Sequence, residues 1–416
     1  MRFIDLFAGL GGFHIGLSKL GHKCVYACEK NETLAALYKE NFNIDAYGDI
    51  RKINLKDIPR HDILCAGFPC QPFSKAGKQL GLGDEENGEY FSYITRILQH
   101  HKPKYLILEN VPNISEHDSK KTWKIISERL NKLDYDILPG KLSPHQFGIP
   151  QFRERLFIVG ARGTLGSFEF PAPLSNQRLD IRTVLQKKTK FAKKLDNKLI
   201  KCLNLWQELL TSIPKDYQFP SFPVWSMEFG ATYPYEHKPP ISLSSNELGK
   251  YRGIFGKQLK GLKKCEQIAL LPAYAKSTKK FPKWKQKFIK QNRNFYTKNK
   301  KSLKPFLRDL MELQPTWQKF EWNCLDEPRK IYNHLIQIRT SGIRVKRTNY
   351  APTIVLSSTQ VPIVGWEKRY MTLKELAKLQ SLGSIALPEE PNVARKAIGN
   401  AVNAELVRLI GSNLLK

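Results

Sequence analysis

The sequence predicts a doubly wound α/β fold into which a second, strongly basic domain is inserted. Three observations support this prediction: strands and helices alternate up to about residue 162, the pattern changes after Gly163, and amphipathic helices return after residue 370. Such alternation is typical of a parallel sheet with helices on both faces. We therefore expect one domain built from residues 1–165 and 366–416, and an inserted domain at 166–365.

Apolar runs bounded by turn residues predict the strands, and apolar residues repeated every three or four positions predict the helices. A capping-box pattern, Thr372 followed by Glu375, marks the start of one helix near the end of the chain. The expected strands are 2–7, 23–29, 62–66, 103–110 and 151–161. The expected helices are 13–20, one ending near Asn41, 89–101, 122–133, 372–383 and 403–415.

The formal charge of +30 indicates a polyanionic partner, and most of it lies in the inserted domain. Residues 181–310 hold 29 Lys and Arg against 8 Asp and Glu, a net charge of +21. The densest segment, 276–304, has twelve basic residues, no acidic ones, and aromatic residues at helical spacing (Phe281, Trp284 and Phe288). We expect a helix that packs its aromatic side chains and offers its lysines to phosphates; a merely solvated surface is the alternative.

The seven cysteines are scattered and form no CxxC pair, so we expect reduced thiols, no disulfide framework and no metal site. No run of 18 apolar residues is present, and the first residues do not resemble a signal peptide. These features predict a cytoplasmic protein that does not interact with membranes.

A glycine-rich turn between the first strand and the first helix predicts a nucleotide-like cofactor. Gly9, Gly11 and Gly12 would let the backbone approach a ligand at the helix N-terminus. Glu29 ends the strand expected at 23–29, and Asp49 follows a further expected strand that ends near YGDI; at such positions a carboxylate can meet ribose hydroxyls. The spacing is not the GxGxxG of a dinucleotide site, and S-adenosyl-L-methionine has a ribose and an adenine but no phosphates.

Two reactive side chains are expected at the same edge of the sheet. Cys70 follows the strand at 62–66, and Glu109 ends the strand at 103–110. Ligands bind at the carboxyl ends of strands in open α/β sheets. Taken singly, Cys70 could be core filling and Glu109 a helix cap, but a thiol and a carboxylate together beside a nucleotide pocket favour a reactive site.

At this point the chain resembles the DNA (cytosine-5) methyltransferases of bacterial restriction-modification systems. The resemblance rests on five motifs in the family's order, and it covers roughly residues 1–162 and 370–416. They are FIDLFAGLGG (3–12), GFPCQPFS (67–74), ENV (109–111), QFRER (151–155) and GNAV (399–402). Ala401 stands where the family usually has serine, a departure of small expected consequence because the family uses that segment mainly through its Asn and its backbone.

The resemblance implies a Rossmann-like, S-adenosylmethionine-dependent methyltransferase that needs no metal and releases S-adenosyl-L-homocysteine. It implies that the Cys70 thiolate adds to C6 of cytosine, that Glu109 protonates N3, and that Asn110 orients the Glu109 loop. Arg155 is expected at cytosine O2, with Arg153 pointing the same way because the two alternate with Glu154 on a strand. The implied cofactor-binding residues are Phe7, Gly9, Leu10, Gly11, Gly12, Glu29, Lys30, Asp49, Ile50, Pro69, Asn400 and Val402.

The implied substrate is double-stranded DNA, in which the target cytosine must flip out of the helix to be attacked. We expect residues 74–89 to form a lid over the flipped base, and the domain at 166–365 to read sequence in the major groove. A monomer is expected, with a cognate restriction endonuclease as functional partner without a stable complex.

Two alternatives stay open: a tRNA cytosine-5 methyltransferase with this fold and cysteine, and a catalytically silent DNA-binding protein. A flavin or nicotinamide oxidoreductase disagrees with the glycine spacing and gives the basic domain no role.

Overall fold

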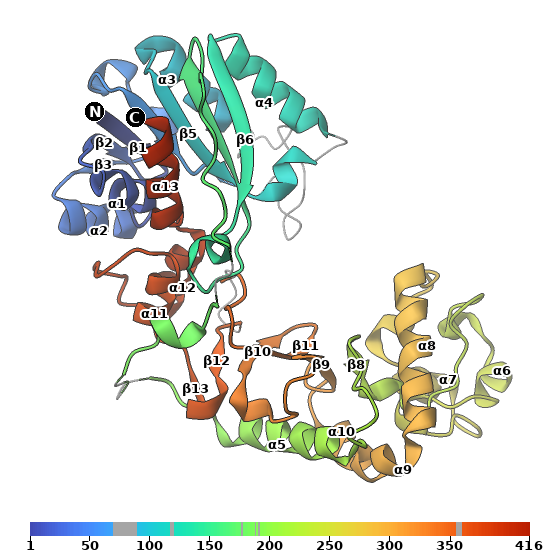
Figure 1. Ribbon diagram of the computed structural model, residues 1–416. Helices are drawn as coiled ribbons and strands as arrows, with labels where there is room; N and C mark the ends of the chain where they lie inside the picture. The colour runs from blue at the N-terminus through green and yellow to red at the C-terminus, as the bar shows by residue number, and fades with distance from the viewer. Residues whose placement is uncertain (70–89, 117–119, 176–177, 188, 190–191, 355–359) are drawn as a thin grey trace. The chain divides into compact units, whose positions relative to one another are not determined.

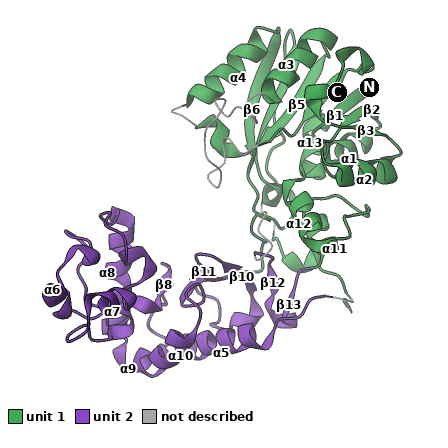
Figure 2. Ribbon diagram, turned by 180° about the vertical axis from the view of Figure 1, so that it is seen from behind, with its two compact units in different colours: residues 1–190, 348–358, 372–416 green, residues 191–347, 359–371 purple. Residues whose placement is uncertain are grey.

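The structure is a computed structural model that describes residues 1–416 except 70–89, 117–119, 176–177, 188, 190–191 and 355–359. The chain divides into two compact units, drawn in different colours in Figure 2. Unit 1 comprises Met1–Lys190, Thr348–Ser358 and Thr372–Lys416, and unit 2 comprises Phe191–Arg347 and Thr359–Met371. Relative to the boundaries expected from the sequence, unit 1 gains residues 166–190 and 348–358, and unit 2 gains residues 366–371.

Unit 1 is built around a seven-stranded sheet with the order β3-β2-β1-β4-β5-β7-β6 (Figure 1). Strands β3, β2, β1, β4 and β5 pair in parallel, as the sequence predicts. The strand bounds are β1 Arg2–Leu6, β2 Lys23–Cys28, β3 Ala46–Tyr47, β4 Ile63–Ala66, β5 Tyr105–Asn110, β6 Tyr135–Leu142 and β7 Arg155–Arg162.

Helices cover both faces of this sheet, because its strands are apolar on both sides. Ile4 belongs to the face that packs on α3 and α4, whereas Phe3, its neighbour in β1, packs on α1 and α13. The helix bounds are α1 Gly12–Ser18, α2 Glu32–Phe42, α3 Tyr90–His101, α4 Lys121–Asn131, α11 Leu373–Leu379, α12 Pro391–Asn400 and α13 Ala404–Leu414. Helix α11 begins at the predicted capping box, with both hydrogen bonds between Thr372 and Glu375 formed, but it ends at Leu379, before the expected Gly383.

The prediction of an all-parallel sheet is wrong at one end. Strand β7 runs antiparallel to both β5 and β6, and β6 was not predicted at all. Pro139 and Gly140 lie inside β6, and such residues usually indicate the absence of a strand. All eight residues of β6 nevertheless pair with β7, so tertiary pairing overrides the local signal.

The two ends of unit 1 pack directly against each other, although all of unit 2 lies between them in the sequence. Helix α13 lies beside α1, and a Cβ atom added at Gly16 would come within 2.6 Å of the Ala404 carbonyl oxygen. A Cβ atom added at Gly12 would meet the Val402 carbonyl oxygen at 2.2 Å. Glycine at these positions therefore permits the close approach of the C-terminal segment to the first helix.

Unit 2 contains a six-stranded sheet with the order β13-β12-β10-β11-β9-β8. Helix α5 packs on this sheet through Trp206, whose ring stacks on Phe320 of β9 at 4.8 Å. The strands are β8 Val224–Trp225, β9 Lys319–Asn323, β10 Leu335–Arg339, β11 Gly342–Lys346, β12 Ile363–Val364 and β13 Arg369–Tyr370. The helices are α5 Asn197–Ser212, α6 Ser245–Gly249, α7 Lys264–Ala269, α8 Lys283–Lys298, α9 Lys300–Leu303 and α10 Leu307–Glu312.

The predicted basic helix is present as α8, but its expected aromatic stripe is only partly correct. Phe281 is buried yet precedes the helix, Phe288 is half-buried, and Trp284 is 54% exposed. The buried face of α8 is formed instead by Ile289, Asn292, Phe295 and Tyr296. Among the residues that the structure describes, every helix is too short or too polar to cross a membrane.

Candidate active site

The glycine-rich turn forms a tight loop between β1 and α1. Phe7, Gly9 and Gly11 all have left-handed backbone conformations, with φ of 57°, 52° and 76°. The Gly9 N–H donates to Glu29 Oε2 at 2.9 Å, and the Asn31 N–H donates to Glu29 Oε1 at 2.8 Å. Glu29, at the end of β2, thus fixes the loop after β1 as well as the start of α2.

A second carboxylate, Asp49, follows β3. Its side chain accepts hydrogen bonds from Arg51, with Nη2 at 2.6 Å, and Lys30 Nζ lies 3.7 Å away. The hydrogen bonds from Arg51 are the main reason that the pKa of Asp49 is lowered to about 2. Asp49 neutralises the neighbouring cations Arg51 and Lys30. This edge of the sheet is therefore better suited to binding the hydroxyl groups of a ligand than its phosphate groups.

The remaining predicted cofactor residues come from several segments of unit 1. Leu10 and Ile50 are buried, Pro69 is half-buried after β4, and Asn400 ends α12 with an exposed side chain. Val402 contacts the loop directly, since it adjoins both Gly12 and Gly67. Glycine conformation, carboxylate placement and the C-terminal segment together fit a nucleoside cofactor without phosphates. In the described part of the chain, no group of three or more His, Cys, Asp or Glu side chains is placed to hold a metal ion.

Glu109 and Asn110 end β5 at the carboxyl edge of the sheet, and both are buried. Asn110 Nδ2 donates to the Phe68 carbonyl oxygen at 3.3 Å, which ties the end of β5 to the loop after β4. A Cβ atom added at Gly67 would lie 3.8 Å from Glu109 Oε2. That loop continues into Cys70, which lies outside the described residues, as does the predicted lid at 74–89.

The two arginines of the QFRER segment both act on Glu109. Arg155 Nε lies 3.0 Å from Glu109 Oε1, and the charges of Arg155 and Arg153 both lower the pKa of Glu109. Burial acts in the opposite direction and outweighs them, so the pKa of Glu109 is raised above its ordinary value. A buried carboxyl with a raised pKa beside two cations is suited to holding or delivering a proton.

The strand predicted at 151–161 is shorter than expected. The prediction that Arg153 and Arg155 point the same way, because they alternate with Glu154 on a strand, is therefore wrong in its premise. β7 begins at Arg155, so Arg153 and Glu154 precede the strand. Arg153 is instead held by hydrogen bonds: its N–H donates to Ser143 Oγ at 2.9 Å, and its Nη2 donates to the Ala401 carbonyl oxygen at 3.1 Å. Arg153 therefore joins the Glu109 site to the C-terminal segment.

Sequence reasoning missed a buried polar network next to the glycine loop. Tyr38 Oη donates to Asp5 Oδ2 at 3.2 Å, and His14 Nδ1 lies 2.8 Å from Tyr38 Oη. Burial raises the pKa of Asp5 to about 8 and lowers that of His14 to about 4. At neutral pH the network is therefore largely uncharged. An acidic residue inside the apolar run RFIDL was the available signal, since buried acids need such partners.

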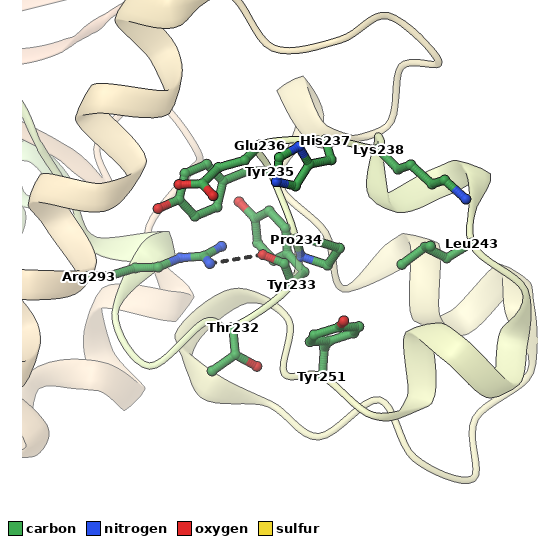
Figure 3. A pocket seen from close by; sticks show the side chains of 10 residues that line it. All are labelled: Thr232, Tyr233, Pro234, Tyr235, Glu236, His237, Lys238, Leu243, Tyr251 and Arg293. Carbon is green, nitrogen blue, oxygen red and sulfur yellow. Dashed lines mark hydrogen bonds between the residues drawn. The ribbon is translucent and has the colours of Figure 1, made fainter.

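A cavity of about 360 Å³ lies in unit 2, and its lining includes none of these residues. Figure 3 shows the Arg293 guanidinium beside the side chains of Tyr233 and Tyr235 at this cavity. Arg293 comes from α8 and donates from Nη1 to the Tyr233 carbonyl oxygen at 2.8 Å and from Nε to Glu228 Oε2 at 2.9 Å.

Comparisons with known proteins identify the family to which the chain is similar. A family model described as C-5 cytosine-specific DNA methylase matches residues 1–416. The Type II methyltransferase M.HaeII of Haemophilus aegyptius is 41% identical over 224 residues, 54% of this chain and 68% of that protein. M.AluI of Cellulosimicrobium cellulans is 29% identical over 98% of this chain and 90% of its own length. Several other bacterial relatives are matched over about half of their own length.

Among solved structures, a putative DNA modification methyltransferase from an Escherichia coli prophage aligns with a TM-score of 0.53. The alignment covers all of this chain and 98% of that one at 17% identity, so it shows a shared fold. The fold of unit 1 is accordingly Rossmann-like.

Proposed function

Because the chain belongs to the C-5 cytosine-specific DNA methylase family, we propose that it methylates C5 of a flipped cytosine in double-stranded DNA through a covalent Cys70–C6 adduct. The family is one of DNA (cytosine-5) methyltransferases of the Type II restriction-modification kind, which confirms the resemblance inferred from the five motifs. S-adenosyl-L-methionine is the cofactor that this family uses.

The observation that carries the proposal is the ion pair between the buried Glu109 and the half-buried Arg155. It lies at the carboxyl end of β5, next to Gly67 and the Phe68 carbonyl group, and hence next to the loop that leads into Cys70. A carboxyl group with a raised pKa can carry a proton at the start of the reaction and give it up when a base nitrogen becomes more basic.

In the proposed reaction the Cys70 thiolate forms a bond to C6, the electron pair of the C5–C6 double bond moves into a C4–C5 double bond, and the pair of the C4–N3 double bond moves onto N3. Glu109 gives its proton to N3, which leaves C5 with the nucleophilic character of an enamine carbon. When bound, S-adenosylmethionine supplies an electrophilic methyl group. Once C5 carries the methyl group, N3 returns its proton to Glu109, the C5 proton leaves to solvent water, and the electron pair of the C5–H bond re-forms the C5–C6 double bond as the C6–S bond breaks and Cys70 leaves as a thiolate. Arg155 holds cytosine O2. Asn110 holds the end of β5 against the loop after β4 through its hydrogen bond to the Phe68 carbonyl oxygen.

The cofactor would be held by the loop after β1 and by the two carboxylates beside it. Glu29 and Asp49 are the acceptors for hydroxyl groups, and the left-handed turn at Gly9 and Gly11 lets the backbone lie close to the ligand. Val402 closes the same loop from the C-terminal side.

Unit 2 is proposed to read the DNA sequence, with residues 74–89 as a lid over the flipped base. The concentration of positive charge in residues 181–310 supports a DNA-binding role. We also propose a protective role beside a cognate restriction endonuclease, and action as a monomer in the bacterial cytoplasm; the similarity to bacterial Type II methyltransferases supports the protective role.

The test is methyl transfer from labelled S-adenosylmethionine to genomic DNA and to total tRNA, with wild-type protein beside Cys70→Ser. We expect label in DNA as 5-methylcytosine and none with the variant. Cys265→Ser, which changes an exposed cysteine of unit 2, is the matched control and keeps the transfer. Label in tRNA alone would contradict the DNA assignment, and transfer by Cys70→Ser would contradict the adduct.

A further inference from the structure

Helix α8 carries a straight row of exposed lysines on the face opposite its buried residues. Successive residues of an α-helix are turned by about 100° and rise by about 1.5 Å. Lys283, Lys287, Lys290 and Lys298 therefore fall within one narrow arc, roughly 22 Å long, and all four are exposed. We call these four residues the α8 lysine row.

The lysine row is set apart from the other basic residues of α8 by its lack of partners. Arg293 points inward, pairs with Glu228, and is covered by the rings of Tyr233 and Tyr235 (Figure 3). Lys285 lies 5.3 Å from the centre of the Trp284 ring. In contrast, no ion pair within the described part of the chain involves any of the four lysines of the row. The inward cations hold the helix in place, and the outward cations remain available.

The row opposes the stability of its own helix. The first turn of α8 has no acidic residue and begins with Lys283, although the positive end of the helix dipole favours anions there. Lys283 and Lys287 are a like-charged i,i+4 pair, which destabilises a helix by a few tenths of a kcal/mol. Other surface helices of this chain combine opposite charges, as in Lys124–Glu128 of α4 and Arg308–Glu312 of α10.

We propose that the α8 lysine row lies along the phosphate backbone of duplex DNA and supplies affinity that does not depend on sequence. Phosphates of one strand rise by about 3.4 Å each along the DNA axis, so a row of this length can meet several of them. The apolar face of α8 is already buried in unit 2 and cannot enter a lipid bilayer, so DNA is favoured over a membrane surface. This inference rests on the proposed function, which makes DNA the substrate.

The experiment measures the binding of a labelled 30-base-pair duplex of random sequence by fluorescence anisotropy between 50 and 300 mM NaCl. The variant combines Lys283→Gln, Lys287→Gln, Lys290→Gln and Lys298→Gln. Each lost phosphate contact lowers the slope of log K against log salt by about 0.9, so we expect a slope shallower by about 3 to 4. Four Lys→Arg changes at the same positions should retain the wild-type slope.

The matched control removes four exposed lysines of unit 1, Lys19, Lys23, Lys124 and Lys132, and so changes the net charge equally. An equal loss of slope in the control, or an unchanged slope in the row variant, would overturn the proposal. So would binding by the wild type to anionic phosphatidylserine vesicles but not to the duplex. Methyl transfer by the wild type is scored separately: a lost slope with no methylated DNA would support the row while contradicting the proposed function.

Discussion

Replacing Gly12 with alanine tests whether the packing of the C-terminal segment supports the loop after β1, which is proposed to hold the cofactor. The new Cβ atom would lie 2.2 Å from the Val402 carbonyl oxygen, whereas ordinary contacts of this kind begin near 3.4 Å. The segment around Val402 must therefore move by more than 1 Å or the start of α1 must distort. Overpacking of this kind costs about 1–3 kcal/mol, which exceeds the gain of up to about 1 kcal/mol from replacing glycine in a helix.

Gly48→Ala is the matched control, because nothing lies within 4 Å of its added Cβ atom. It should leave stability unchanged or raise it by up to about 1 kcal/mol. Urea denaturation measures the free energy of unfolding, and calorimetry measures the affinity for S-adenosylmethionine. We expect Gly12→Ala to lower both. Equal unfolding midpoints for the two variants would refute the packing argument, and lowered stability with unchanged cofactor affinity would refute the role of Val402 in closing the loop.

Two further predictions concern buried acids. Arg155→Gln removes a positive charge beside Glu109 and should raise the pKa of Glu109 further. The alkaline limb of the pH profile of kcat/KM should therefore move to higher pH, even if the rate falls. A limb that stays in place would mean that another group titrates there. Asp5 has a folded-state pKa of about 8, above its value of about 3.9 in an unfolded chain, so the stability that it provides at low pH is lost as pH rises through this window. The Asp5→Asn variant lacks this pH-dependent loss of stability. Its free energy of unfolding, measured by urea denaturation, should rise relative to that of wild type by up to about 1.4 kcal/mol per pH unit between pH 5 and 7. A constant difference between the two proteins over this range would contradict the raised pKa.

The parallel part of the sheet could be predicted because each strand is a short apolar run bounded by clear turn residues. β6 could not, since Pro139 and Gly140 argue locally against a strand that is formed through its pairing with β7. The strands of unit 2 are two to five residues long, too short for an alternating pattern to stand out.

In the candidate site, too, residues could be placed where a pattern of neighbouring residues indicates them, but contacts between residues far apart in the sequence could not be predicted. Glu109 and Asn110 could be placed from their position at the end of a strand. The contact of Arg153 with Ala401 joins residues 248 positions apart, and the contact of Tyr38 with Asp5 joins residues 33 positions apart. Such pairs are created by the fold, and no spacing within one segment predicts them.

The packing of Val402 against Gly12 has a consequence for how the protein is made. A ribosome synthesises the glycine loop and the first strands early, but it synthesises α13 and the Val402 segment only after all of unit 2. Until α13 has been synthesised, the apolar face of α1 that it covers stays exposed. The loop after β1 likewise lacks its contact with Val402 during that time. A product truncated within unit 2 would lack that contact.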